Sequence, residues 1–218
     1  MKTSNLEVME IAIPAGATSL PGTLELPYSA AGVAIFAHGS GSGRSSPRNR
    51  DVAESLHGRG VGTLLFDLLT EPEGADRRNV FDIDLLSERL LAAARWTMSH
   101  PATASMPIGL FGASTGGAAA LVVAAQEPMI RAAVSRGGRP DLAGAWLAQV
   151  RAPTLLIVGG EDHEVLKLNR NAFEELRCKK RLEVVPGATH LFEEPGALEA
   201  VAQLAGEWFL FHFGAGDS

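Results

Sequence analysis

The chain has 218 residues, of which 46% are hydrophobic and 20% are charged, and its formal net charge is −6. The apolar content excludes a disordered chain, and the length favours a single domain over residues 1–218, because single cores grow to about 250 residues. The acidic balance argues against nucleic acid as a partner, since phosphate binding needs a basic face.

The N-terminal segment lacks the features of a secretion signal. Glu7 and Glu10 interrupt it, and no stretch of the chain reaches about 18 uninterrupted apolar residues. We therefore expect a cytoplasmic protein with no membrane partner. Cys178 is the single cysteine, so an intramolecular disulfide and a thiolate metal cluster are both excluded.

The order of the expected elements indicates an α/β fold. Residues 7–13 and 22–26 alternate around Pro21 and Gly22 and predict an antiparallel hairpin at the edge of a sheet. Continuous apolar runs separated by helical patterns predict a mostly parallel central sheet of about seven to eight strands with helices on both faces. The runs are 33–36, 62–66, 108–111, 132–134, 154–158 and 182–185.

The helices are recognised by their caps and their apolar stripes. Ser46 and Pro47 mark a helix start, as an N-cap followed by proline at the first helical position, and Gly58 or Gly60 marks its end. Apolar residues recur on one face of two further segments, 81–99 and the segment after Pro195, and predict helices there. Helices are also expected at 118–125 and near 141–150.

The strongest motif is Gly112-Ala113-Ser114-Thr115-Gly116, which has the pattern G-x-S-x-G. It follows a predicted strand and precedes an alanine-rich helix, the context in which a serine is held on a strained turn and glycines give the space. Ser114 is therefore the candidate nucleophile. A glycine-rich anion-binding turn is the alternative, but the lysine of a phosphate-binding loop is missing.

A base and an acid follow in the order that the motif requires. Asp162 comes after the strand 154–158 and His190 after the strand 182–185, so both open onto the sheet edge that carries Ser114. We expect His190 Nε2 to face the hydroxyl and Asp162 to hold Nδ1. Rival residues are Glu161 and Asp141 for the acid and His163 for the base.

Two backbone donors are expected to form an oxyanion hole. Thr115 offers one N–H at the start of a helix, and the glycine-rich segment 38–43 offers the other. Ser40 is the first choice in this segment and Gly41 the second. A flexible surface loop is the alternative interpretation of the same glycines.

With these motifs, residues 32–213 resemble the α/β-hydrolase superfamily and, within it, the compact dienelactone-hydrolase-like branch. The resemblance implies the α/β-hydrolase fold and the triad Ser114, Asp162 and His190. Dienelactone hydrolases are known for a cysteine nucleophile, whereas this chain has Ser114. That departure favours chemistry similar to a serine carboxylesterase over dienelactone hydrolysis.

The substrate is expected to be a small ester. Residues 134–140 lead within a few positions into the next helix, which leaves little room for a cap domain, and an open site favours small acyl groups. Gly41 and Arg136 are weaker candidates for substrate contacts. Arginines near the site could clamp a carboxylate, but ion pairs with the acidic segment 71–76 and with the many other carboxylates of the chain are the stronger interpretation. These are Arg44, Arg48, Arg50, Arg136 and Arg139.

No cofactor or metal is expected. The six histidines include no pair at i, i+4 on a helix, and segment 39–43 has the wrong glycine spacing for a dinucleotide site. The sequence thus predicts a serine hydrolase that forms an acyl-enzyme at Ser114. A homodimer and one half of a larger fused protein both stay open as its assembly. An acyltransferase, thioesterase or perhydrolase with the same triad, and a non-catalytic binding module on the same fold, are the alternatives.

Overall fold

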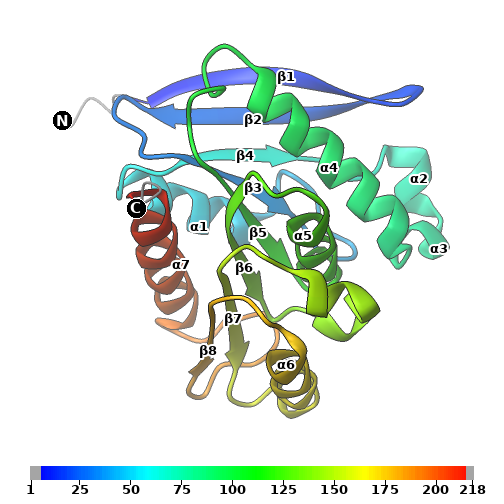
Figure 1. Cartoon of the computed structure of the whole chain (residues 1–218), viewed down its shortest axis with the longest axis vertical. Helices are drawn as coiled ribbons and strands as arrows, with labels where there is room; N and C mark the ends of the chain where they lie inside the picture. The colour runs from blue at the N-terminus through cyan, green and yellow to red at the C-terminus, as the bar shows by residue number, and fades with distance from the viewer. Residues whose placement is uncertain (1–5, 215–218) are drawn as a thin grey trace.

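The protein is described by a computed structural model that covers residues 6–214. One eight-stranded sheet forms its centre, in the order β1-β2-β4-β3-β5-β6-β7-β8 (Figure 1). The strands are β1 (Leu6–Ala15), β2 (Thr18–Pro27), β3 (Val33–Ala37), β4 (Gly62–Phe66), β5 (Ile108–Ala113), β6 (Ile130–Arg136), β7 (Thr154–Gly159) and β8 (Lys180–Val185).

The sheet is parallel from β4 to β8, and β1 and β2 are antiparallel additions at one edge. Every residue of β3, β4, β5 and β7 is buried, because helices cover both faces of these central strands. The expected α/β-hydrolase fold, with a mostly parallel sheet of about eight strands, is confirmed.

Helices lie on both faces of the sheet (Figure 1). On one face α1 packs against α7, and on the other α5 packs against α4 and against the 3-10 segment η1, which in turn contacts α6. The bounds are α1 (Pro47–His57), α2 (Glu71–Ala75), α3 (Arg77–Val80), α4 (Ile83–Ser99), α5 (Thr115–Gln126), η1 (Pro140–Gln149), α6 (His163–Glu175) and α7 (Ala197–Gly214). In residues 6–214 no helix is both long and apolar enough to cross a membrane.

Two local expectations are wrong. The hairpin turns at residues 15–18, where Gly16 has φ 64°, and Pro21 and Gly22 lie within β2. Both residues have partners within the sheet: the Pro21 carbonyl accepts from Asp67 N–H, and Gly22 lies against the Phe66 side chain. Ser46 precedes α1 as expected, but its side chain makes no capping hydrogen bond.

Gly116 allows the first turn of α5 to approach β3. A Cβ atom at this position would lie 2.1 Å from the Ala37 carbonyl oxygen and 2.7 Å from the His38 oxygen, and both are backbone atoms that cannot rotate away. The glycine is therefore required by packing, in addition to any role in catalysis.

We expect Gly116→Ala to lower the free energy of unfolding by at least about 3 kcal/mol, because α5 has to move off the sheet. Urea denaturation measures the change. Gly74→Ala is the matched control: a Cβ at Gly74 meets no atom within 4 Å, so its effect should stay within about 1 kcal/mol. Equal effects of the two substitutions would contradict the packing argument.

Candidate active site

Ser114 lies on the turn between β5 and α5, at the carboxyl edge of the sheet. Its backbone has φ 52° and ψ −120°, a strained conformation for a residue with a side chain. Two backbone hydrogen bonds hold the turn: Ser114 N–H donates to the Arg136 carbonyl oxygen at 3.3 Å, and the Ser114 carbonyl oxygen accepts from Arg139 N–H at 3.1 Å. The half-buried serine is thus fixed on a sharp bend between two buried elements.

His190 and Asp162 come from the loops after β8 and β7, which are neighbouring parallel strands. Nδ1 of His190 lies 2.6 Å from Oδ2 of Asp162. A carboxylate accepts only, so His190 donates through Nδ1, and Nε2 is left free to accept a proton.

Asp162 makes this contact and leaves its own helix without a side-chain cap. It is the N-cap residue of α6, a position at which aspartate usually accepts from a backbone N–H, yet its side chain makes no capping hydrogen bond. The carboxylate turns to the imidazole of His190 instead. This choice of partner favours a functional interpretation of the pair over a purely structural one.

The loop that carries His190 packs beside the serine turn. A Cβ atom at Gly137 would lie 3.6 Å from Cε1 of His190, and Gly137 directly follows Arg136, whose carbonyl holds Ser114. Phe192, two residues after the histidine, is buried with φ 56° and fixes the loop in an unusual conformation. The hydroxyl of Ser114 makes no hydrogen bond to His190 here, a contact that commonly forms only when substrate is bound.

The rival residues lie elsewhere. Asp141 is paired with Arg139 through two hydrogen bonds of 2.9 and 2.7 Å. Glu161 and His163 are exposed, and the His163 Nε2 and Glu161 Oε2 atoms lie 3.8 Å from each other. The structure thus pairs Asp162 with His190, and it gives the rival residues other partners.

The glycine-rich segment after β3 lies against the nucleophile. A Cβ atom at Gly39 would be 2.9 Å from Cβ of Ser114, so the two backbones are in direct contact. Ser40 and Gly41 follow in an exposed turn in which Gly41 has φ 68°, and both line the same cavity as Thr115. The structure therefore brings Thr115, Ser40 and Gly41 together as expected and adds Gly39, which touches Ser114.

His38 anchors this segment, a role that the sequence analysis missed. Its Nε2 accepts from Leu68 N–H at 3.0 Å, so the proton is on Nδ1, which donates to the Gly39 oxygen at 3.1 Å. Burial lowers the pKa of this imidazole, with smaller opposing contributions from the Gly39 carbonyl and Asp67. A histidine directly before the glycine run and after a buried strand is the signal that could have indicated the role.

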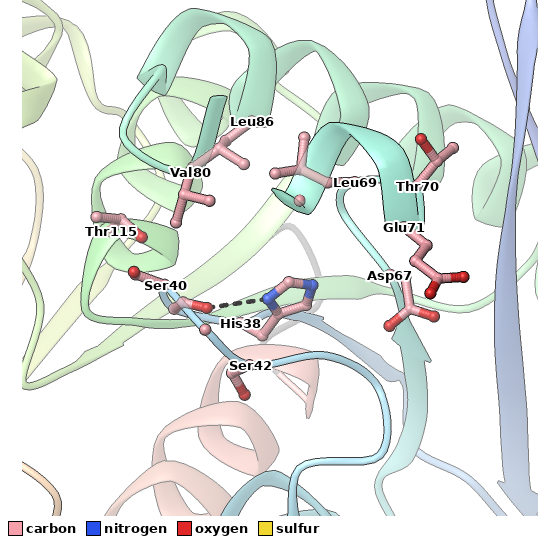
Figure 2. Close-up of a pocket in the computed structure, with 13 residues that line it drawn as sticks. His38, Ser40, Ser42, Asp67, Leu69, Thr70, Glu71, Val80, Leu86 and Thr115 are labelled. Carbon is pink, nitrogen blue, oxygen red and sulfur yellow. Dashed lines mark hydrogen bonds between the residues drawn. The ribbon is translucent and has the colours of Figure 1, made fainter. Parts of the chain in front are cut away.

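A cavity of about 290 Å³ opens beside the segment (Figure 2). His38 and Ser40 form one side, and Leu69, Val80 and Leu86 bring apolar side chains from the opposite side, which includes α3 and α4. The short helices α2 and α3, absent from the sequence-based prediction, thus contribute a wall of the pocket. The segment after β6 reaches η1 within four residues, as expected from the sequence.

Four arginines near the site have acidic partners or neighbours, and one does not. Arg44 pairs with Glu10 and Asp67, Arg139 with Asp141, and Arg48 with Glu193; Arg50 lies within electrostatic reach of Glu10 and Glu25. These partners do not belong to segment 71–76, whose Glu73 and Asp76 pair with Arg89 and Arg78. Arg136 is only 8% exposed and its Nη1 has no hydrogen-bond partner in the described part of the chain.

Metal ligation is not suggested by the described side chains. Within residues 6–214, no three histidine, cysteine, aspartate or glutamate residues gather in a way that could hold an ion. Cys178 is a half-buried free thiol whose Sγ contacts the Thr154 hydroxyl, and burial raises its pKa.

Comparison with known proteins identifies the family. Residues 74–208 match the dienelactone hydrolase family. The chain belongs to this family. The crystal structure of a dienelactone hydrolase from Anabaena variabilis is similar with a TM-score of 0.93 and 52% identity, covering 95% of this chain and 99% of that one. The fold alone is shared with Est1E from Butyrivibrio proteoclasticus, at a TM-score of 0.78 and 18% identity over 93% of this chain and 98% of that one.

A longer relative has a different name. A protein of Mycobacterium tuberculosis, provisionally named a phosphoribosyl transferase, is 57% identical over 211 residues. The match covers 96% of this chain but 48% of the relative, so this dienelactone hydrolase family member spans about half the length of that protein.

Proposed function

We propose that this family member is a serine hydrolase that cleaves small carboxylic esters through an acyl-enzyme at Ser114. One observation carries the proposal: the 2.6 Å contact between His190 Nδ1 and Asp162 Oδ2 leaves Nε2 free at the sheet edge where the strained turn presents Ser114. A serine hydroxyl is a weak nucleophile by itself and needs a base that a third group orients.

The reaction has two halves. The Ser114 oxygen attacks the ester carbonyl while its proton passes to His190 Nε2, and Asp162 stabilises the imidazolium. The tetrahedral intermediate collapses when His190 returns this proton to the leaving alkoxide, which departs as an alcohol. Water then attacks the acyl-enzyme and gives a proton to His190. His190 passes this proton to Ser114 Oγ as the second tetrahedral intermediate breaks the bond to the serine, which releases the carboxylic acid and restores free Ser114.

The oxyanion of each tetrahedral intermediate is assigned to the backbone N–H groups of Thr115 and Ser40. Their support is that both residues line the cavity beside Ser114, while His38 holds the preceding carbonyl of Gly39 in place. Each correctly aimed donor contributes roughly 3 to 4 kcal/mol to the transition state.

The size and lining of the cavity support the proposal that the substrate has a short acyl chain. Its volume of about 290 Å³ lies at the lower end of ligand sites, and Leu69, Val80 and Leu86 offer an apolar surface. Acetyl to butyryl groups fit this size. Transfer of the acyl group to another acceptor uses the same triad, and product analysis with a competing alcohol or thiol distinguishes it from hydrolysis.

The name of the longer relative belongs, in our proposal, to the half of that protein that this chain does not match. The support is that this chain, which matches one half of that protein, itself matches the dienelactone hydrolase family over residues 74–208 and the Anabaena variabilis structure over 95% of its length. Phosphoribosyl transfer is therefore not assigned to Ser114.

The test is covalent labelling together with turnover. The protein should hydrolyse p-nitrophenyl acetate and butyrate, and a fluorophosphonate probe should modify Ser114 in the peptide identified by mass spectrometry. A protein that shows neither turnover nor label would instead be a non-catalytic binding module on this fold.

A further inference from the structure

Asp67 is the first residue after β4, and its carboxylate reaches the far end of the glycine-rich segment 38–43. Its Oδ1 accepts from the Arg44 N–H at 2.7 Å. Asp67 is held by the sheet in turn, because its own N–H donates to the Pro21 carbonyl oxygen at 3.1 Å. The carboxylate therefore ties the residue directly after the segment to a fixed point at the carboxyl edge of the sheet.

The near end of the segment is tied to the same place. His38 Nε2 accepts from the N–H of Leu68, the residue that directly follows Asp67, at 3.0 Å. Two consecutive residues after β4 thus hold both ends of segment 38–43, one through its backbone N–H and the other through its carboxylate.

The proposed oxyanion donor lies between these two ties. Ser40 is exposed, and its turn is closed by a backbone hydrogen bond of 3.2 Å from Ser42 N–H to the Gly39 carbonyl oxygen. A run that contains three glycines has more backbone freedom than other sequences, so the place of the Ser40 N–H depends on how the ends of the run are held.

The carboxylate of Asp67 fits closely and is oriented by further contacts. A Cβ atom at Gly43 would lie 2.8 Å from Asp67 Oδ1, so the backbone of the segment passes directly beside the carboxylate. Asp67 Oδ2 lies 3.4 Å from Arg44 Nε, and Arg44 Nη1 pairs with Glu10 Oε2 of β1 at 2.7 Å. Asp67 also lines the cavity beside the segment (Figure 2).

We propose that Asp67 is a positioning residue of the oxyanion hole, which acts through its hydrogen bond to the Arg44 N–H and so aims the Ser40 N–H at the oxyanion. This inference rests on the proposed esterase function, in which Ser40 supplies one of the two donors. A donor that moves by about 1 Å loses much of its contribution to the transition state, while substrate binding in the ground state changes little.

The kinetic test uses two substitutions of Asp67. Asp67→Ala removes the acceptor and should lower kcat for p-nitrophenyl butyrate by about ten- to hundredfold, with a change in KM of less than about threefold. Asp67→Asn keeps an oxygen that accepts from the Arg44 N–H, so its kcat should stay within about fivefold of the wild type. Titration with a fluorophosphonate counts the active sites, so that kcat refers to folded protein.

Glu127→Ala is the matched control. Glu127 is also a carboxylate beside a strand end: its Oε1 accepts from the Met129 N–H at 3.4 Å, and its Oε2 lies 3.8 Å from Arg95 Nε. It precedes β6 at the opposite edge of the sheet, so its replacement should change kcat less than about twofold. An equal loss of kcat in Glu127→Ala and Asp67→Ala would overturn the proposal.

A sulfur-substituted ester distinguishes a positioning role from a structural one. In p-nitrophenyl thionobutyrate, sulfur replaces the carbonyl oxygen and is a weak hydrogen-bond acceptor, so a well-aimed oxyanion hole favours the oxygen ester. The ratio of kcat/KM for the oxygen ester to that for the sulfur ester should fall at least about fivefold in Asp67→Ala and recover in Asp67→Asn. Equal losses for both esters would show that Asp67 only supports the fold, and would overturn the proposal.

Hydrogen exchange separates this proposal from the esterase proposal. The backbone amides of residues 38–46 should exchange faster in Asp67→Ala than in the wild type, and Asp67→Asn should restore the slower rate. Mass spectrometry of peptides measures the rates. Faster exchange in a protein without ester turnover would retain the tie and reject the esterase, whereas turnover with an unchanged ratio of the two esters would overturn the positioning role of Asp67.

Discussion

We expect Ser114→Ala to reduce kcat for p-nitrophenyl butyrate by about 10⁵- to 10⁶-fold and to abolish labelling by a fluorophosphonate. The alanine removes the atom that forms the acyl-enzyme, and His190 and Asp162 cannot act as a nucleophile in its place. The fold should persist, because the substitution removes one oxygen and leaves the backbone hydrogen bonds of the turn intact.

Ser45→Ala is the control for this experiment. Ser45 is an exposed serine near the same loop and has no place in the proposed site, so its replacement should preserve both turnover and label. Circular dichroism and the melting temperature verify that both variants are folded. Retention of turnover by Ser114→Ala, or a label on a different residue, would refute the assignment of the nucleophile.

The elements that were predicted correctly are those fixed by local sequence. Five-residue runs such as 33–37 and 62–66 are buried over their whole length, so their continuous apolar character appears directly in the sequence. The turn that carries Ser114 was predicted for the same reason. A Cβ atom at Gly112 or at Gly116 would collide with nearby backbone atoms, so both positions need glycine, and the two glycines are visible in the sequence. The match to the family confirms the hydrolase fold that these patterns indicated.

The features that were missed depend on distant contacts or on short segments. Helices α2 and α3 have five and four residues, too few for a periodic apolar pattern, yet they border the cavity. Pro21 and Gly22 are a strong turn signal locally, but the pairing of β2 with β1, which includes both residues, keeps them in a strand. Sequence spacing gives no indication that Arg48 meets Glu193, which lies 145 positions away.

Segment 38–43 shows both what the local sequence indicates and what depends on distant contacts. The glycines of 39–43 indicated a loop of unusual backbone, but which residue touches Ser114 depends on how β3 is placed beside β5, and the contact falls at Gly39. The role of His38 depends on Leu68, the second residue after β4. Parallel strands that are far apart in the chain thus build the site. The residue types of the site can be recognised in the sequence, but the distances between them depend on how these strands pair.

Replacement of Asp162 by asparagine should lower kcat by about 10³- to 10⁴-fold, with a much smaller effect on KM. Asparagine has nearly the same shape but no charge, so it cannot stabilise the imidazolium of His190 that forms in each half of the reaction. Its amide group can also donate to Nδ1, which would move the imidazole proton to Nε2 and prevent that atom from accepting the Ser114 proton. Steady-state kinetics measures both parameters.

Glu161→Gln removes a neighbouring carboxylate that is exposed and lies near His163, so it serves as the matched control and should change kcat less than about threefold. A larger loss in Glu161→Gln than in Asp162→Asn would transfer the role of the acid to Glu161. The expected order follows from a single geometric fact: among residues 6–214 it is Asp162 whose carboxylate contacts His190 Nδ1, at 2.6 Å, and this carboxylate does not cap its own helix. Because the Asp162 carboxylate contacts the imidazole and not the backbone of its helix, its replacement should lower kcat more than it lowers the free energy of unfolding.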